Sequence, residues 1–476
     1  MSAKMQCRID DLPDELLEYI LSLIPPYKDL QECKLVSKRW FRATKNVIEH
    51  NEAHFRKAVS FGALFWSLWP KKTRMPTISK RHSHSACIYE NSMYVFGGCT
   101  ATSTTFNDLW RLDLDTRTWV RPITMGSYPS PKACATMLYY KKSFVLFGGW
   151  SYPSRYPLHQ QWKLFNELHV YSIETNKWNA INTLEAPPPM SAHSATIHGN
   201  NMVVFGGIHC SSNDLWCLNL DTYSWHKQAT AIIKPRPRYG QSQIHLGDRH
   251  ILVLGGCTGP NAAMNDAWLL NMTEPTWKWK KVILYHPEWA PAKQRHRADV
   301  DTDENVNGRH GSFSRSPSQS RMNNPPSRKS NFSKIVPFCC DSALSMAAFR
   351  DKPTNNNLSI NRQRQLEYLK KMEEKIRSRK TQTKVAKRTE NTLSIFILDI
   401  SKVLCDECSA SWVPLKEIDQ SGPDERILYS LVMGRGELIV FGGIRKEQTN
   451  IQTQPDVDDL EVYNDLHFIN PPKYVI

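Results

Sequence analysis

The segment Met93-Tyr94-Val95-Phe96-Gly97-Gly98 is an apolar run of strand length that ends in two glycines. Four further glycine pairs follow similar apolar runs, at residues 148–149, 206–207, 255–256 and 442–443. Glycine lets a chain turn and approach its neighbours where a Cβ would clash, so each pair marks the end of a buried strand. The five copies indicate a repeated β-structural unit.

Two more markers recur along the chain. The first is an Asn followed by an acidic residue at the start of an alternating strand: Asn107-Asp108, Asn166-Glu167, Asn213-Asp214, Asn265-Asp266 and Asn464-Asp465. The second is a single tryptophan on the following strand: Trp119, Trp178, Trp225, and either Trp277 or Trp279. A unit of four short strands cannot bury both of its apolar faces alone, so the units must stack. Closing the stack into a ring leaves only short, protected edges, and we expect an all-β propeller.

The spacing of the glycine pairs predicts the number of blades. The first glycines lie at 97, 148, 206 and 255, but the next lies at 442, an interval of 187 residues. Two blades of about fifty residues fit in that interval and leave roughly 87 residues over. We therefore expect six blades, with an insertion that interrupts the fifth. The second half of blade 5 is predicted at residues 392–400 and Trp412, and its first half either at residues 337–349 or near Trp289.

The sixth blade has no tryptophan strand after it, so its outer strand must come from elsewhere. Residues 63–70, just before the first blade, contain Trp66 and Trp69. Trp69 precedes His84 by the same fifteen residues that separate Trp178 from His193. We expect residues 63–70 to close the ring, with Trp69 or alternatively Trp66 in the tryptophan position.

The N-terminal residues have a different pattern, with Leu16, Leu17, Ile20 and Leu23 at helical spacing and Pro25-Pro26 after them. A second helix is predicted through Leu30 to Trp40. The expected organisation is a flexible N-terminus at 1–8, a small all-α domain at 9–55, the closing strand and blades 1–4 at 63–289, an insertion at 290–391, and the rest of blade 5 with blade 6 at 392–476.

The insertion carries most of the positive charge. Residues 289–390 hold 22 Lys and Arg against 10 Asp and Glu, which is +12 of the total of +15. Residues 312–333 are rich in Ser, Pro, Arg and Asn, and such a composition buries too little apolar area to offset chain entropy. We therefore expect a long, disordered, basic insertion. Its Lys370-Lys371 and Lys384–Arg388 clusters fit a nuclear-import patch or a solvated linker at least as well as a nucleic-acid site.

The chain has no run of eighteen apolar residues, and its first residues lead into Asp10-Asp11 without an apolar segment. We therefore expect neither a membrane span nor a secretory signal, and a location in the cytoplasm, the nucleus or both. Cys405 and Cys408 have no second cysteine pair at zinc spacing, so neither a metal nor a cofactor is expected.

Two stretches in the helical part, Ile9–Leu17 and Cys33–Trp40, closely resemble the opening and the close of an F-box. The Gly-Gly, Asn-acidic and Trp markers resemble Kelch repeats, and the combination resembles the F-box/Kelch substrate receptors of ubiquitin ligases. That resemblance implies that the F-box binds a Skp-type adaptor, which attaches to a cullin scaffold with its RING subunit. The chain itself would be a non-catalytic receptor. The resemblance places at the adaptor, or within the F-box helices, Leu12, Pro13, Leu16, Ile20, Leu23, Val36 and Trp40.

The target protein is expected on propeller loops, because loops on a rigid scaffold carry recognition. The loops after the Gly-Gly pairs and those that lead into each blade share one face. Tyr, Trp and Arg are typical of binding hot spots, and a cationic rim favours an acidic or phosphorylated target. The candidate side chains are Arg81, Lys132, Trp150, Tyr152, Arg155, Tyr156, Arg236, Arg238 and Tyr239.

Other functions remain as alternatives. Some Kelch-like propellers are copper oxidases, but no spaced histidine cluster here resembles copper ligands, and the sequence has no Gly-x-Ser-x-Gly, P-loop or His-Glu-x-x-His motif. The main alternative is a Kelch interaction scaffold, for example a cytoskeletal one, that acts outside a ligase.

Overall fold

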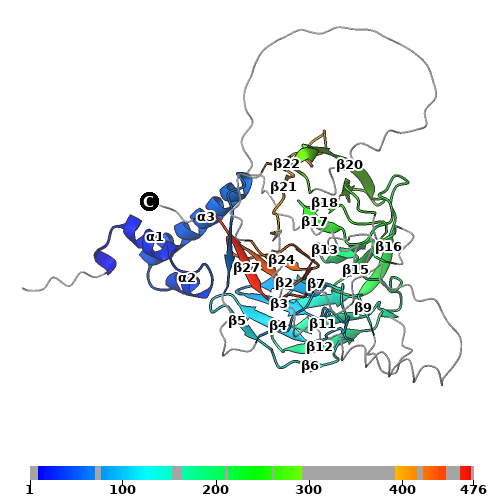
Figure 1. Cartoon of the computed structure of the whole chain (residues 1–476), viewed down its shortest axis with the longest axis horizontal. Helices are drawn as coiled ribbons and strands as arrows, with labels where there is room; N and C mark the ends of the chain where they lie inside the picture. The colour runs from blue at the N-terminus through cyan, green and yellow to red at the C-terminus, as the bar shows by residue number, and fades with distance from the viewer. Residues whose placement is uncertain are drawn as a thin grey trace, which may run out of the picture.

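The computed structural model describes residues 9–69, 77–152, 163–208, 213–259, 262–291, 392–414, 422–445 and 461–472. A short 3-10 turn at Ile9–Asp11 and three helices come first: α1 (Asp14–Ser22), α2 (Lys28–Cys33) and α3 (Lys38–Ser60). Figure 1 shows these helices beside a ring of small sheets. None of the helices in the described ranges is long and apolar enough to cross a membrane.

The predicted second helix is in fact two helices. The α2 helix ends at Cys33, and α3 begins after Ser37, whose side chain accepts a hydrogen bond from the backbone N–H of Trp40. A serine in this position satisfies one of the N–H groups left free at a helix start, which favours a new helix over continuation of the old one. The α3 helix then continues to Ser60, beyond the boundary expected at residue 55.

The strands after the helices form consecutive four-stranded antiparallel blades. Blade 1 contains β2 (Ser85–Tyr89), β3 (Ser92–Phe96), β4 (Leu109–Asp113) and β5 (Thr118–Val120). Blade 2 contains β7 (Thr136–Tyr140), β8 (Ser143–Phe147), β11 (Leu168–Ser172) and β12 (Lys177–Ile181). Blade 3 contains β13 (Ser194–His198), β14 (Asn201–Phe205), β15 (Leu215–Asn219) and β16 (Ser224–Gln228). Blade 4 contains β17 (Ser242–Leu246), β18 (His250–Leu254), β19 (Ala267–Asn271) and β20 (Lys278–Tyr285).

The ring is closed by a strand from the N-terminal side, as expected. The closing blade contains β24 (Ser430–Met433), β25 (Leu438–Phe441), β27 (Leu466–Asn470) and, as its outermost strand, β1 (Phe65–Leu68). Trp66 lies opposite Ile469, just as Trp119 lies opposite Leu112 in blade 1. Trp66, rather than Trp69, therefore occupies the tryptophan position, because the strand register and not the spacing along the chain decides it.

The prediction of six blades is wrong for the residues that the structure describes, because they form five four-stranded blades. The predicted second half of blade 5 forms β21 (Ile397–Asp399) and β22 (Ser409–Val413). β20 is eight residues long, and its last three residues pair in parallel with β22 beyond the part that pairs with β19. The two extra strands therefore extend the sheet of blade 4 instead of forming a separate sheet.

Of the two segments considered for the first half of blade 5, the one near Trp289 forms a 3-10 turn, η2 (Pro287–Trp289), and no strand. The other, residues 337–349, lies outside the described residues. The expected insertion, apart from Ala290 and Pro291, and the expected flexible N-terminus at 1–8 also lie outside them.

A pair of aromatic rings joins each blade to the next around most of the ring. The last strand residue before the glycine pair packs against the tryptophan of the following blade: Phe96 on Trp178, Phe147 on Trp225, Phe205 on Trp279, and Phe441 on Trp119. The ring centroids lie 4.8 to 5.3 Å apart. Such pairs contribute large buried areas and specific geometry, which explains why tryptophan recurs in each unit.

Smaller strand pairs and a backbone belt complete the scaffold. The short strands are β6 (Met125–Gly126), β9 (Trp150–Ser151), β10 (Lys163–Leu164), β23 (Arg426–Ile427) and β26 (Ile444–Arg445). The belt is a series of backbone hydrogen bonds from blade to blade, in which Ser83 donates to Leu428, Cys134 to Ser83, Ala192 to Cys134 and Gly240 to Ala192. These bonds fix the start of each innermost strand.

Candidate functional site

The α1 helix has two apolar faces. Leu17 and Leu21 on one face are fully buried and pack with Leu30, Ala43 and Val47 in the core of the helical segment. The other face is turned to solvent, and the exposed fractions of Leu16 and Leu23 are 49% and 68%. Helix amphipathicity normally places polar residues on the outer face, so exposed leucines there indicate a surface that another protein covers.

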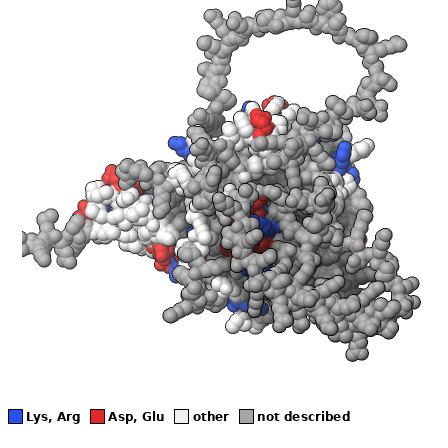
Figure 2. All heavy atoms as spheres, viewed as in Figure 1, with Lys and Arg blue, Asp and Glu red and all other residues white. Residues whose placement is uncertain are grey.

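The exposed apolar side chains continue onto the turn between α2 and α3. Leu35 and Val36 are 85% and 61% exposed, and Phe41 is half exposed beside a hollow lined by Lys34 and Arg42, among others. We call the set Leu16, Ile20, Leu23, Leu35, Val36 and Phe41 the apolar helical face. On the side of the helical segment that Figure 2 shows, most side chains are uncharged and acidic side chains lie at the margins.

The predicted F-box residues divide between this face and its support. Leu16, Ile20, Leu23 and Val36 belong to the apolar helical face, and Pro13 is an exposed residue that precedes α1. Leu12 is half-buried. Trp40 packs against the buried core of the segment and therefore holds the helices together. Whether these residues contact an adaptor stays a prediction.

Sequence reasoning missed two strong members of the apolar helical face, Leu35 and Phe41. Both lie in or next to the Cys33–Trp40 motif, and a helical projection of residues 38–48 would have separated Phe41 from the buried Ala43 and Val47. Leu35 lies in the turn between helices, where no periodic signal exists.

Three cationic residues predicted on the propeller rim are instead buried. Arg81, Lys132 and Arg238 are at most 1% exposed, and this corrects their assignment as residues available to a target. Arg81 donates to both carboxylate oxygens of Asp108, at 2.7 and 2.9 Å, and to the carbonyl oxygen of Gly97. Each cation therefore binds the acidic residue of its own blade's Asn-acidic marker.

The same buried ion pair recurs around the ring. Arg238 pairs with Asp266 at 2.7 Å, Arg426 with Asp465 at 2.5 Å, and Lys132 with Glu167 at 2.7 Å. Burial alone raises the pKa of Asp266, but the hydrogen bonds and the charge of Arg238 outweigh it and lower the pKa below its ordinary value. In blade 3 the position of the cation is held by Met190, and Asp214 pairs with the exposed Lys227.

The other predicted target residues have mixed positions. Trp150 is 7% exposed and packs against Cys99 and Ala133, so it too is structural. Tyr152 and Tyr239 are half-buried, and Arg236 is exposed. Arg155 and Tyr156 lie outside the described residues.

Large apolar side chains are exposed on the connections that lead from the outer strand of one blade to the next blade. Ile123, Leu184 and Ile232 are 89%, 108% and 98% exposed. Because successive strands alternate in direction, these connections lie on the same face as the loops after the glycine pairs. We call this the connector face. Sequence reasoning overlooked these residues. Leu184 is a single large apolar residue in a mostly polar loop, whereas Ile232 is followed by a second exposed isoleucine, Ile233, which is 71% exposed.

Burial keeps two histidines of the propeller uncharged. Burial lowers the pKa of His82 to about 4 and that of His193 to about 3, so both are neutral at physiological pH. Within the described ranges, no three His, Cys, Asp or Glu side chains are grouped so that they could hold a metal ion.

Comparisons with known proteins agree with this two-part construction. Residues 9–48 match the family model described as F-box-like, and residues 81–277 match that of the FBX42 β-propeller domain. Within the second match, the runs at 93–100, 106–114 and 126–132 are the ones that resemble F-box only protein 42 in sequence.

Several relatives in the comparison are Kelch domain-containing proteins. Kelch domain-containing protein 1 of Mus musculus is 28% identical over 243 residues, 46% of this chain and 59% of that protein. Kelch domain-containing protein 3 of Rattus norvegicus is 30% identical over 196 residues, 39% of this chain and 50% of that protein. The chain thus spans about half the length of these relatives. It combines an F-box-like segment with a Kelch-type β-propeller similar to that of FBX42, and so resembles the F-box/Kelch receptors.

Proposed function

We propose that this chain is the substrate-recognition subunit of a ubiquitin ligase of the Skp–cullin–F-box type. The F-box-like helices bind a Skp-type adaptor, and through it the cullin scaffold and RING subunit. The propeller binds a target protein, which is ubiquitinated and then degraded. The observation that carries the proposal is the apolar helical face. Leu16, Leu23 and Leu35 are exposed beside a segment that already has a complete core of its own.

The energetics favour a covered surface over a solvated one. Fully burying a leucine side chain contributes about 2 kcal/mol of hydrophobic free energy. In the free chain the exposed leucines of the apolar helical face do not gain this free energy. A partner with a complementary apolar groove recovers it. The chain does no chemistry in this role. It accelerates transfer of ubiquitin by holding a target lysine near the enzyme that carries it.

The target binds, in this proposal, on the connector face and the adjoining loops. Exposed apolar side chains such as Ile123 and Leu184 lie there with exposed cations such as Arg121 and Arg236. That mixture supports an acidic or phosphorylated target segment with apolar residues. Tyr152, Arg155, Tyr156, Arg236 and Tyr239 remain the predicted contacts, and the complex is proposed to act in the cytoplasm, the nucleus or both.

The adaptor interaction is testable with a matched pair of charge substitutions. Leu16→Glu with Leu23→Glu places two charges on the apolar helical face, and Leu404→Glu changes an exposed leucine on the propeller, 52% exposed. Titration calorimetry with purified adaptor should show binding to the intact chain and to L404E. Since hot-spot residues each cost about 2 kcal/mol or more, L16E/L23E should bind at least about 100-fold more weakly.

Equal adaptor affinity for all three proteins would contradict the docking site. No binding of the adaptor to the intact chain would remove the ligase role, and the propeller would then be treated as an interaction scaffold outside a ligase.

A further inference from the structure

One residue of the F-box-like segment is part of the propeller core. Tyr27, in the turn between α1 and α2, is fully buried. Its ring packs among side chains of blade 1 and the closing blade, including Met93, Ile439 and Phe468. These two blades meet where the ring is closed by β1, so the tyrosine fills the seam of the ring.

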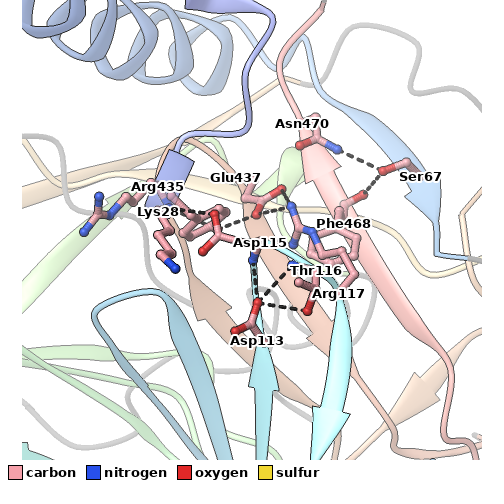
Figure 3. Close-up of polar contacts among 11 residues, drawn as sticks. Lys28, Ser67, Asp113, Asp115, Thr116, Arg117, Arg435, Glu437, Phe468 and Asn470 are labelled. Atoms are coloured by element: carbon pink, nitrogen blue, oxygen red, sulfur yellow. Dashed lines mark hydrogen bonds and ion pairs between the residues drawn. The ribbon is translucent and has the colours of Figure 1, made fainter. Parts of the chain in front are cut away.

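The Tyr27 hydroxyl belongs to a buried cluster of polar groups. It donates a hydrogen bond to Oε1 of Glu437, and the guanidinium of Arg117 donates to both oxygens of the same carboxylate at 2.8 and 3.0 Å (Figure 3). Burial first, and then the charge of Glu437, raise the pKa of Tyr27 far above its ordinary value, so the hydroxyl stays a donor. Glu437 is 6% exposed, and Arg117 also lies 3.9 Å above the ring of Phe468.

The residues beside Tyr27 are held as well. The backbone N–H of Lys28 donates to Oδ1 of Asp115 at 2.6 Å, and Arg435 donates to the carbonyl oxygen of Pro26 at 3.4 Å. Asp115 and Arg117 belong to the β4–β5 hairpin of blade 1, whereas Arg435 and Glu437 belong to the β24–β25 hairpin of the closing blade. Two separate hairpins therefore form hydrogen bonds with the same turn of the helical segment.

The hairpin fold itself does not require Arg117. The equivalent turn positions of blades 2 and 3 are Asn176 and Tyr223, which have the same positive φ, at 52° and 55° against 53° for Arg117. Arginine occurs at this turn position only in blade 1, among these three blades, and blade 1 is the one that contacts the helical segment. The side chain is therefore explained by its contact with Glu437.

A second anchor lies at the other end of the segment. Phe55 and Val59 of α3 are buried against Leu438, Val440 and Ile469 of the closing blade. With that anchor alone, α3 would be a lever of 23 residues, about 34 Å at 1.5 Å per residue, whose far end could swing widely. Tyr27 holds the far end, because α1, α2 and the first half of α3 share one core.

We propose that Tyr27, Glu437 and Arg117 form a latch that fixes the angle between the apolar helical face and the propeller. The biological meaning of the latch rests on the proposed function, because a fixed angle decides which target lysines an attached ubiquitin-loaded enzyme can reach. The mechanical statement does not depend on that function. Removal of the latch leaves both binding surfaces intact and frees the angle between them.

The decisive measurement is a distance distribution in the full chain. Keto-amino-acid spin labels at Ser22 and Thr273, both exposed, avoid the native cysteines and report the distance between α1 and blade 4 by double electron–electron resonance. The intact chain should give one narrow distribution. Tyr27→Ala should broaden it at least about twofold, as expected when one of two anchors is lost. Tyr27→Phe, which keeps the ring and removes the hydroxyl, should give an intermediate width.

The matched control is Tyr285→Phe, which removes an exposed tyrosine hydroxyl that donates to Glu407 at 2.7 Å at the end of β20. It should leave the distribution unchanged. A distribution for folded Tyr27→Ala that matches the intact chain overturns the latch, and so does equal broadening by Tyr285→Phe. If Tyr27→Ala does not fold, an unchanged width in Tyr27→Phe overturns it.

A second arm separates the latch from the ligase role. Adaptor affinity is measured on the same variants and should be unchanged by Tyr27→Ala, because Tyr27 is not part of the apolar helical face. In the assembled ligase, self-ubiquitination should modify a few propeller lysines of the intact chain and a wider set in the variant. An identical set of lysines would overturn the functional meaning of the latch. Failure of the adaptor to bind the intact chain would refute the proposed function and leave the distance test standing.

Discussion

Arg238 and Asp266 show what a single side-chain pair contributes to this ring. Arg238→Met leaves the carboxylate of Asp266 buried without its partner, so the free energy of unfolding should fall by about 3–5 kcal/mol. Methionine fits at this position, because Met190 occupies it in blade 3. Urea unfolding followed by tryptophan fluorescence measures the loss. Lys141→Met, in the exposed pair with Asp221, is the control and should cause no measurable change.

A buried histidine should make stability fall below neutral pH. Burial holds the pKa of His193 at about 3, whereas the unfolded chain titrates near 6.5, so the unfolded state binds the extra proton between these values. Stability from this group is therefore complete above about pH 6.5 and decreases as the pH falls, by about 1.4 kcal/mol per pH unit. The decrease should end near the folded-state pKa.

His193→Gln should remove that part of the slope. Glutamine suits the site, because Gln241 occupies the equivalent position in blade 4 and donates to Ser194 at 2.9 Å, much as His193 contacts Thr136 at 2.9 Å. Unfolding free energies measured from pH 4 to 7 should show a shallower profile for H193Q. Parallel profiles for the two proteins would mean that His193 is not neutral in the folded state.

At the residue scale, the sequence drew attention to cationic side chains but did not reveal the carboxylates with which they pair. Arg81 precedes Asp108 by 27 residues, and only the antiparallel register of blade 1 brings the two together. A cation in a loop before a strand looks exposed in the sequence. The sequence did contain a signal for these ion pairs. An acidic residue follows the cation at a similar spacing in several blades, and opposite charges repeated at a fixed spacing predict a repeated ion pair.

Glycine is required at the Gly-Gly pairs more than in the hairpin turns. Gly97 and Gly199 both have positive φ, at 65° and 59°. A Cβ at Gly97 would lie 2.5 Å from the carbonyl oxygen of Lys132 in the next blade, whereas a Cβ at Gly199 meets no atom within 4 Å. Gly199→Ala should therefore cost only the conformational strain of about 1 kcal/mol, and Gly97→Ala about 3 kcal/mol or more.

Thermal and urea denaturation of the two alanine variants measure the loss of stability. Because both glycines have a similar positive φ, the difference between the two losses reports the steric overlap of the new Cβ and not the backbone strain. Similar losses for both variants would show that the close approach of Gly97 to blade 2 is not maintained in solution. The difference also explains why the Gly-Gly pairs, unlike other turn glycines, are a reliable signature of blades.

At the element scale, the marker residues predicted four blades, the closing strand, and strands in the region of residues 392–412 where β21 and β22 lie. Two details required the fold. Trp66 rather than Trp69 faces Ile469, because pairing register is set by β27 and not by loop length. Among the described residues the count of six was wrong. The apolar end of β20, Ile283 to Tyr285, pairs in parallel with β22, and this pairing could not be predicted from residues so far apart in the sequence.

At the scale of the whole molecule, the two candidate surfaces point in different directions. The helical segment contacts hairpins between the first and second and between the third and fourth strands of blades, at Glu437 and Arg117. Those hairpins lie at the opposite ends of the strands from the glycine pairs and the connector face. The adaptor proposed to bind the helices would therefore leave the connector face open, as the proposed receptor role requires.

This arrangement also predicts that the helices and the ring unfold together. Phe55 of α3 is 1% exposed and completes the core of the closing blade, whereas Phe61, six residues later, is 53% exposed. Phe55→Ala should lower the free energy of unfolding by about 3–5 kcal/mol, and Phe61→Ala should change it by less than about 0.5 kcal/mol. Helical circular dichroism and tryptophan fluorescence should move to lower denaturant together in F55A, because most tryptophans lie in the propeller and the lost contact joins the two parts. If the helical signal moved alone, the F-box-like segment would be an independent unit, and the ring would not need the helices for its stability.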